Sequence, residues 1–569
     1  MAQSQAVTSP SASTSTSTVA QILSAPTNTS AIDMSRETTI ASPSIPELSS
    51  LEKVRQKLQP LLLYVVSTAQ FLDIVNGASV SVAIIPIADE LKFSVPVMPW
   101  ILNAYTIAFA GLLLLSGRLG DLFGHRRMFL FGLFWFATWA LVVSFATSPI
   151  MFVIARALQG VGAAATVPTA MALIATNYPA GPERTKAFSI FAAFGGLGAV
   201  FGILMAGGLI STIGWVWIFR ISAIAAYLVL IFGFLSIPVA PPKDEKPKVD
   251  YVGATTATLG ITGVVYYITT GVEDGWASPK TLPVFIAGLV LLGAFIYTES
   301  KVSAPLMPFR IWKSRTFTAS VVLAFVQMAM FQGVIYFTNM IFQEVYGWTA
   351  IQTALGFLTH SLLAVVTFTT MGRILPRLRL KPLILTGFLL RCVAALLLSF
   401  VTEHTSYWRL AFPGLILHVF GVGFSMLPIQ ITAVRDAENK DQGLVGAIYN
   451  TGLQFGAPFG LSILNVISIA TNGNDVEGVH GGAAMMRGYK NAFYGIIAMG
   501  LFGFLLAMVI LPWDRPAIPA KKEVTKEQEQ LDLEVGSPMD GESVVDEMDT
   551  KVETDAGTIQ GEKEDEVKA

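Results

Sequence analysis

Gly117-Arg118-Leu119-Gly120-Asp121-Leu122-Phe123-Gly124-His125-Arg126-Arg127 stands between two long apolar runs, at 100–116 and 128–146. This stretch is short, charged and punctuated by glycine, whereas charges are scarce in the rest of the hydrophobic part of the chain. Basic residues in a short connection between apolar runs are typical of the cytoplasmic side of a membrane protein. We interpret the stretch as a topology anchor that is also a conformational latch, formed by Gly117, Asp121, Gly124, Arg126 and Arg127.

The composition around this stretch is that of a membrane protein. The chain has 569 residues, of which 53% are hydrophobic and only 13% are charged, with a mean hydropathy of +0.60. A soluble domain typically carries about 25% charged residues. The single cysteine, Cys392, lies inside an apolar run, so a disulfide framework is excluded. A net charge of −2 gives no indication of nucleic-acid binding.

The apolar runs have the length of membrane spans, because a helix needs about 20 apolar residues to cross a bilayer. The sequence therefore predicts an all-α polytopic membrane protein with about fourteen spans. We expect them near 61–86, 98–116, 128–147, 150–174, 187–211, 215–238, 252–271, 281–299, 316–343, 352–371, 383–401, 409–431, 443–470 and 491–512.

Lysine and arginine in the connections set the expected orientation. The connections at 117–127 and 372–381 belong to a basic set, and the alternate set, which includes 89–92 and 147–149, is poorer in basic residues. The basic set is predicted to be cytoplasmic, and an even number of spans then places both termini in the cytoplasm. We expect the cell membrane as the location, with the vacuolar membrane as the alternative.

The two ends of the chain differ from its hydrophobic part. Residues 1–59 are rich in Ser, Thr, Pro and Ala and lack the pattern of a signal peptide, and residues 514–569 are strongly acidic. Both are predicted to be disordered cytoplasmic segments. The acidic tail is read either as a regulatory or trafficking segment or simply as a solvated tail.

A second basic stretch indicates an internal repeat. Gly372–Lys381 repeats the glycine, the following arginine, an aliphatic residue and the terminal basic residue of 117–126, with Pro376 in place of Asp121. If the pair of spans at 252–299 is an insertion, the two copies follow the second and the eighth of twelve spans. Two six-helix halves are therefore predicted, at 60–240 and 316–513, with a linker at 241–315 that holds two extra transmembrane helices.

Two ionisable residues inside predicted spans are candidates for proton coupling, since charges in lipid are costly. Asp73 shares an arc of about 120° with Gln70 and Asn76, at 100° per residue. A carboxylate near mid-membrane must pair, be protonated or face water, which suits a proton carrier; the alternative is a hydrogen bond to a neighbouring helix. Arg156 is a permanent cation that can act on such a carboxylate, unless it only extends to the membrane surface.

Neutral polar residues lie along one face of a later span. Gln332, Tyr336, Asn339 and Gln343 follow offsets of four, three and four. Such a stripe suits a cavity wall for a partly polar organic solute, although interhelical hydrogen bonds explain some of these groups. The predicted cavity-lining residues are Gln70, Asn76, Gln159, Gln332, Tyr336, Asn339, Asn450 and Gln454.

The remaining polar and small residues of the spans are assigned structural roles. Helix packing, or a hinge, is predicted for Gly198, Gly202, Gly207 and Gly208. His360 and His418 are each read as packing residues, and Arg391 needs a partner that the sequence does not name. No metal-ligand cluster, phosphate loop or nucleophile–base set appears in the sequence. We therefore expect neither metal, cofactor nor enzymatic activity.

With these motifs in place, the chain resembles a major facilitator superfamily transporter, and more closely the fourteen-helix drug:proton antiporters of the second drug/proton family, particularly fungal ones. The stretch 117–127 is similar to the superfamily's signature between helices two and three. The segment 72–76 matches the family's first-helix motif, and Trp100 and Tyr105 match its second helix. Arg156–Gly162 matches the fourth-helix motif that the family links to proton transfer. The penultimate-helix pattern is matched by Gly443, Asn450, Gln454, Gly456 and Gly460.

The resemblance covers residues 60 to 512, with two departures. Ile203 follows Gly202 where the antiporter motif has proline, and Val216 stands where the sixth helix has arginine. The resemblance implies proton-coupled export of toxins, secondary metabolites or drugs by a functional monomer, with a proton gradient as the energy source. The expected partners are a small-molecule substrate, protons and the lipid bilayer. The alternatives are uptake or vacuolar transport of amino acids or siderophore-like chelates, and a transporter-like sensor.

Overall fold

The structure, a computed structural model, describes residues 57–179, 181–239, 250–302, 305, 307–435, 437, 441–472 and 485–513. The segments predicted to be disordered, 1–59 and 514–569, therefore lie almost entirely outside the described residues. The division of the chain at 240 and at 315 is not tested by the fold and stays a prediction.

Fourteen helices are long and apolar enough to cross a membrane, and no strand occurs among the described residues. The all-α polytopic fold and the number of spans are confirmed. The helices are α2 (Leu62–Leu91), α3 (Trp100–Phe123), α4 (His125–Val143), α5 (Pro149–Asn177), α6 (Pro182–Thr212), α7 (Val216–Ser236), α8 (Tyr251–Asp274), α9 (Leu282–Lys301), α10 (Arg315–Met340), α11 (Ala350–Ile374), α12 (Leu380–Ser399), α13 (Ala411–Arg435), α14 (Gln442–Asn472) and α15 (Met486–Ile510). The short helices are η1 (Gln59–Leu61), η2 (Val95–Val97), η3 (Ile311–Lys313), η4 (Ile341–Val345) and η5 (Leu375–Arg377).

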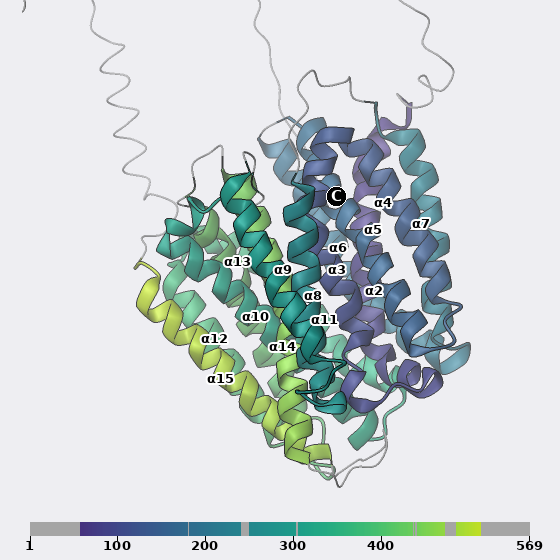
Figure 1. Ribbon diagram of the computed structural model, residues 1–569, viewed down its shortest axis with the longest axis vertical. Coiled ribbons are helices and arrows are strands. Elements are labelled where there is room, and N and C mark those ends of the chain that lie inside the picture. The colour runs from purple at the N-terminus through teal and green to yellow at the C-terminus, as the bar shows by residue number, and fades with distance from the viewer. Residues whose placement is uncertain are drawn as a thin grey trace, which may run out of the picture. The chain divides into compact units, whose positions relative to one another are not determined.

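The helices form two halves with the same packing scheme. In the first half α2 packs on α6, α4 on α5, and α4 on α7; in the second half α10 packs on α14, α12 on α13, and α12 on α15. The extra helices α8 and α9 pack on each other, and α8 also contacts α3 of the first half and α14 of the second. In Figure 1 this teal pair lies in front of the place where the blue and green helices meet.

Close glycine contacts hold α6 against α2. A Cβ atom on Gly198 would lie 2.8 Å from the carbonyl oxygen of Phe71, and one on Gly202 would lie 2.6 Å from that of Val75. Ser79 Oγ also donates a hydrogen bond of 2.8 Å to the carbonyl oxygen of Gly202. Only hydrogen at these two positions lets the helices approach so closely.

The later glycines of α6 face different surroundings. A Cβ on Gly207 would lie 2.6 Å from Cβ of Ala354 on α11, so this glycine belongs to the contact between the two halves. A Cβ on Gly208 would meet nothing within 4 Å. Gly208 therefore makes no close contact with another described helix, and the prediction of packing or a hinge is left open for it.

The charged stretch at 117–127 is mostly helical, and the prediction of a loop there was wrong. Helix α3 continues to Phe123 and α4 starts at His125, so a single residue, Gly124, makes the connection with a φ of +93°. Glycine adopts positive φ without the steric cost that other residues incur. Charged side chains on the last turn of α3 and the first turn of α4 can reach water, so the helix need not end where the apolar run ends.

The two halves meet at one end of the helices. We call the end that carries Asp121 the Asp121 end, and the opposite one the far end. Asn465 Nδ2 donates to the carbonyl oxygen of Pro96 at 3.0 Å, and Gln343 Nε2 donates to that of Val82 at 3.0 Å. These residues lie in the far halves of their helices or in a far-end connection. Each hydrogen bond joins one half to the other.

The apolar core follows the same division. One cluster joins residues of the far part of the first half, such as Ile84 and Phe152, to Phe337 and Ile496 of the second half. A separate cluster, which includes Phe129, holds residues of the first half towards the Asp121 end. The structure is therefore closed at the far end.

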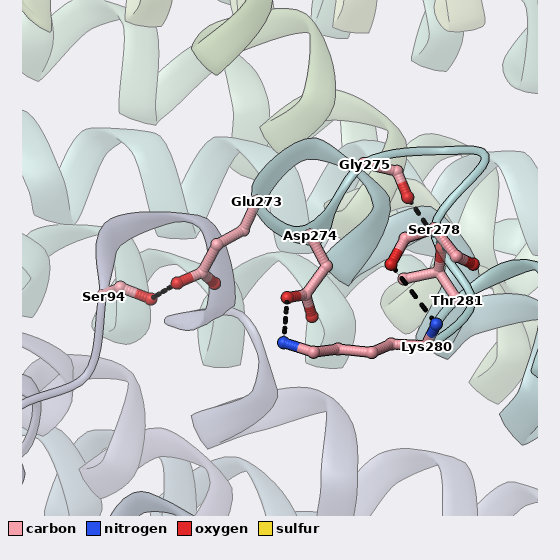
Figure 2. A network of polar contacts seen from close by, with 7 residues as sticks. All are labelled: Ser94, Glu273, Asp274, Gly275, Ser278, Lys280 and Thr281. Carbon is pink, nitrogen blue, oxygen red and sulfur yellow. Dashed lines mark hydrogen bonds and ion pairs between the residues drawn. The ribbon is translucent and has the colours of Figure 1, made fainter.

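The far tip of the extra helices is fixed to the first half by polar contacts, which Figure 2 shows. Ser94, just before η2, donates through Oγ to Glu273 Oε1 at 2.8 Å. Beside it, Lys280 Nζ lies 3.0 Å from Asp274 Oδ1, and this hydrogen bond raises the pKa of the Lys280 ammonium. Ser94 lies in the connection between α2 and α3, and Glu273 lies near the end of α8. Their contact therefore positions α8 beside α3.

Gly160→Val is expected to destabilise the protein strongly, because a Cβ at this position would overlap the carbonyl oxygen of Tyr105 on α3. Overpacking costs about 1–3 kcal/mol and more when backbone must move. We expect a lower midpoint of thermal unfolding for the detergent-purified protein. Gly208→Val is the matched control, since that position is open, and an equal loss in both variants would contradict this explanation.

Candidate functional site

Asp73 lies on α2 and is bound by a side chain of α3. The hydroxyl of Tyr105 donates a hydrogen bond to Asp73 Oδ1. The carboxylate is half-buried, while Tyr105 is only 6% exposed. Asp73 therefore has an internal hydrogen-bond donor and keeps some exposed surface, which a group that exchanges protons requires.

Arg156 of α5 is buried in the same region, with 1% of its surface exposed. Its Nη1 donates to Asn76 Oδ1 at 2.5 Å and to Gln159 Oε1 at 2.7 Å. Its guanidinium carbon lies 4.4 Å from the centre of the Tyr105 ring and 5.7 Å from that of Phe219 on α7. The alternative that Arg156 extends to the membrane surface is thus wrong.

Tyr105 connects the two predicted charges. Its hydroxyl binds Asp73, and its ring lies against Arg156. Within the described part of the chain, no ion pair joins Asp73 directly to Arg156. A change of charge on Asp73 therefore reaches Arg156 through the field across Tyr105, where a low-dielectric interior screens charges weakly.

Several polar atoms beside this cluster have no partner among the described residues. They are Arg156 Nε, Asn76 Nδ2, Gln159 Nε2 and Gln70 Oε1. Buried polar groups are usually hydrogen-bonded, so these atoms can receive a polar group of a solute or water. The structure thus brings the predicted residues Asp73, Asn76, Gln159 and Arg156 together around Tyr105, whereas Gln70, one turn before Asp73 on α2, lies beside Gly195 of α6.

Glycine spacing on α5 explains how Arg156 reaches this position. Gly160, one turn after Arg156, contacts the backbone of Tyr105. A Cβ on Gly162 would lie 2.6 Å from the backbone nitrogen of Phe136 on α4, so a second face of α5 is also pressed against a neighbour. The segment 156–162 therefore places α5 between α3 and α4, with Arg156 facing Tyr105.

One residue of the predicted polar stripe, Gln343, makes hydrogen bonds that hold the far end closed. Gln343 Nε2 donates to Asn339 Oδ1 at 2.8 Å as well as to Val82 across the two halves. Tyr336 is buried and borders a small cavity with Tyr489. The other predicted cavity residues, Gln332, Asn450 and Gln454, are half-buried. Their contact with a solute stays a prediction.

A polar node at the far end was missed by the sequence reasoning. Asn103 Nδ2 of α3 donates to Ser462 Oγ of α14 at 3.1 Å. Ser462 Oγ also lies 2.7 Å from Thr269 Oγ1 of α8. All three are buried and come from the first half, the second half and the extra pair. Asn103, an amide inside an apolar run, is the signal that could have pointed to this node.

The latch residues act partly within the first half. Arg126 donates from Nε to the carbonyl oxygen of Ile237 and from Nη2 to that of Phe234, each at 2.9 Å, and so caps the end of α7. Asp121 Oδ1 lies 3.6 Å from His125 Nε2, across the turn at Gly124. Gly117 lies near Pro168 of α5, and Arg127 is exposed. A latch function for this set stays a prediction.

Tyr105→Phe is expected to lower transport by about tenfold while leaving the protein folded. The ring against Arg156 remains, but Asp73 loses its hydrogen bond, and a bond to a charged group contributes about 1.5–3 kcal/mol. The pH dependence of transport should shift at the same time. Unchanged transport and unchanged pH dependence would show that the hydroxyl has no part in coupling.

Comparisons with known proteins agree with this architecture. Residues 66–461 match the family model of the Major Facilitator Superfamily. The chain is 32% identical over 456 residues to the puromycin resistance protein pur8 of Streptomyces alboniger, which covers 79% of this chain and 90% of that protein. It is 30% identical over 465 residues to the cephamycin export protein CmcT of Amycolatopsis lactamdurans, covering 80% and 92%. The crystal structure of the POT family transporter PepTSo, 14% identical, shares the fold with a TM-score of 0.58 over 83% of this chain and 99% of that one.

Proposed function

Since the chain belongs to the Major Facilitator Superfamily, and is a multi-pass membrane transporter, we propose that it uses a proton gradient to export small, largely apolar organic compounds. The observation that carries the proposal is the link from Asp73 through Tyr105 to Arg156. A carboxylate able to take up a proton is coupled there to a buried permanent cation. The names of two relatives, a resistance protein and an export protein, support the direction.

Proton binding on Asp73 changes the charge balance of the site. With Asp73 ionised, the negative carboxylate and Arg156 neutralise one another across Tyr105. With Asp73 protonated, Arg156 loses this counter-charge. A different arrangement of α2, α3 and α5 then becomes favourable. Since α2 and α3 also make contacts that close the far end, this charge change favours closure there, so that a proton taken up from the far side is carried to the Asp121 end.

The gradient supplies enough free energy for concentrative export. Moving one charge through 100 mV provides about 2.3 kcal/mol, which corresponds to a concentration ratio of about fifty. The far end is closed in this structure. If the Asp121 end faces the cytoplasm, as the basic connections predict, this state receives cargo from the cell interior. We place the protein in the plasma membrane, with both termini in the cytoplasm.

The test uses inside-out vesicles from cells that express the chain and lack other drug exporters. Puromycin and a cephamycin are the first compounds tried, because they are the ones in the relatives' names. With an acidic lumen, an exporter accumulates cargo in the lumen, and an ionophore that collapses the pH gradient stops this accumulation. Loss of preloaded cargo from the lumen under the same gradient would instead show uptake. Absence of gradient-driven movement across a wide panel of compounds would favour a sensor.

A further inference from the structure

A second buried polar cluster lies in the second half, away from Asp73. His360 of α11 and His418 of α13 face each other, with Nε2 of the first 3.2 Å from Nδ1 of the second. Their exposed fractions are 6% and 0%. The ring of Phe331 on α10 stacks on His418 with 5.7 Å between centres. The two histidines, read separately from the sequence, thus form one pair.

Arg391 of α12 is the charged group that faces this pair. It is fully buried, and its Nη2 donates to the backbone carbonyl of Gln327 on α10, one helical turn before Phe331. The stem of Arg391 packs where Gly421 leaves room on α13, three residues after His418. Four helices therefore bring these side chains to one centre.

The positive charge of Arg391 is buried with no carboxylate, among the described residues, to neutralise it. Among the described residues, no Asp or Glu forms an ion pair with Arg391. Burying an ionised group without a partner is strongly unfavourable. In the first half Asp73 lies across Tyr105 from the buried Arg156, whereas the titratable groups near Arg391 are its chain neighbour Cys392, His418 and, in contact with His418, His360.

The atoms without partners in this centre are mostly donors. They are Arg391 Nε, Arg391 Nη1, Gln327 Nε2, Gln327 Oε1 and His418 Nε2. The two arginine atoms and the amide nitrogen only donate, and His418 Nε2 donates when Nδ1 accepts from His360. Donors beside a fixed positive charge suit an anion and oppose a cation.

We propose that Arg391, Gln327 and His418 form a binding centre for a small monovalent inorganic anion of the size of chloride. The residues of the centre are at most 6% exposed, so a drug-sized cargo cannot reach it. The anion supplies the counter-charge that Arg391 lacks and joins α10, α12 and α13. This centre is separate from the residues assigned to proton coupling, and the proposal does not depend on the direction of transport.

The test measures thermal unfolding of the full-length protein, purified in detergent, with sodium chloride replacing sodium gluconate at constant ionic strength and pH. Gluconate is a much larger anion than chloride and serves as the comparison. We expect the unfolding midpoint to rise by a few degrees and to saturate with chloride, since a ligand that binds only the folded state stabilises it. Gln327→Leu removes one donor and should shift the half-saturating chloride concentration at least about tenfold upward. Arg391→Met should abolish the response.

Arg220→Gln is the matched control, because Arg220 lies on α7 between Phe145 and Trp217 and not in this centre. Its chloride response should equal that of the unmodified protein. If Arg391→Met does not fold, Gln327→Leu and direct binding of radiolabelled chloride still decide the question. Equal midpoints in chloride and gluconate, or an unchanged response in Gln327→Leu, would overturn the proposal and leave water as the partner of these donors.

Discussion

Arg156→Met is expected to reduce transport by at least about 100-fold while the protein still inserts and folds. Methionine fills most of the space of the arginine stem but removes the cation that Asp73 faces across Tyr105 and the hydrogen bonds to Asn76 and Gln159. A loss of 100-fold corresponds to about 2.7 kcal/mol of transition-state stabilisation. The measurement is cargo accumulation in inside-out vesicles, normalised to the amount of folded protein.

Arg156→Lys separates charge from geometry. Lysine keeps the positive charge but lacks the planar guanidinium, which stacks on aromatic rings and is not interchangeable with an ammonium. We expect this variant to retain a small fraction of transport, well above that of Arg156→Met. If both variants transport like the unmodified protein, Arg156 has a purely structural role.

Asp121→Ala is expected to stop turnover while the protein still reaches its membrane. The second stretch, at 372–381, keeps the basic residues but has Pro376 in place of an acid, so basicity suffices for topology at both places. The first stretch differs from the second in having an acidic residue, Asp121, which faces His125 across the single-residue turn. Membrane insertion is checked by surface labelling and turnover by the vesicle assay.

Glu183→Ala provides the control for Asp121→Ala. Glu183 is an exposed acid in the first turn of α6, at the same end of the helices, so its loss should leave transport intact. If Asp121→Ala instead fails to insert, the stretch is only a topology anchor. If it inserts and transports normally, the latch interpretation is wrong.

Much of the fold was predictable because the bilayer imposes a length and an apolar composition on each span. The helix ends were not, since charged residues on the final turns do not interrupt a helix. This is why α3 runs to Phe123, seven residues beyond the predicted end at 116. The repeat at 372–381 correctly indicated two halves of similar packing.

The candidate site was predictable only in part. Asp73 and Arg156 stood out because charges inside lipid are rare, but their connection through Tyr105 depends on how α2, α3 and α5 cross. Pairs such as Asn103 and Ser462, or His360 and His418, join helices far apart in the sequence. Periodicity along a single helix places each residue on a face, and it does not say which face of another helix it meets.

The measurement that tests proton coupling most directly follows protons in proteoliposomes that contain cargo and a pH-sensitive dye in the lumen. Movement of cargo outward should draw protons inward, so the lumen acidifies with the unmodified protein. With Asp73→Asn we expect no acidification, although exchange of labelled for unlabelled cargo, which needs no net proton movement, continues. Acidification by Asp73→Asn at the rate of the unmodified protein would show that Asp73 does not couple protons to export.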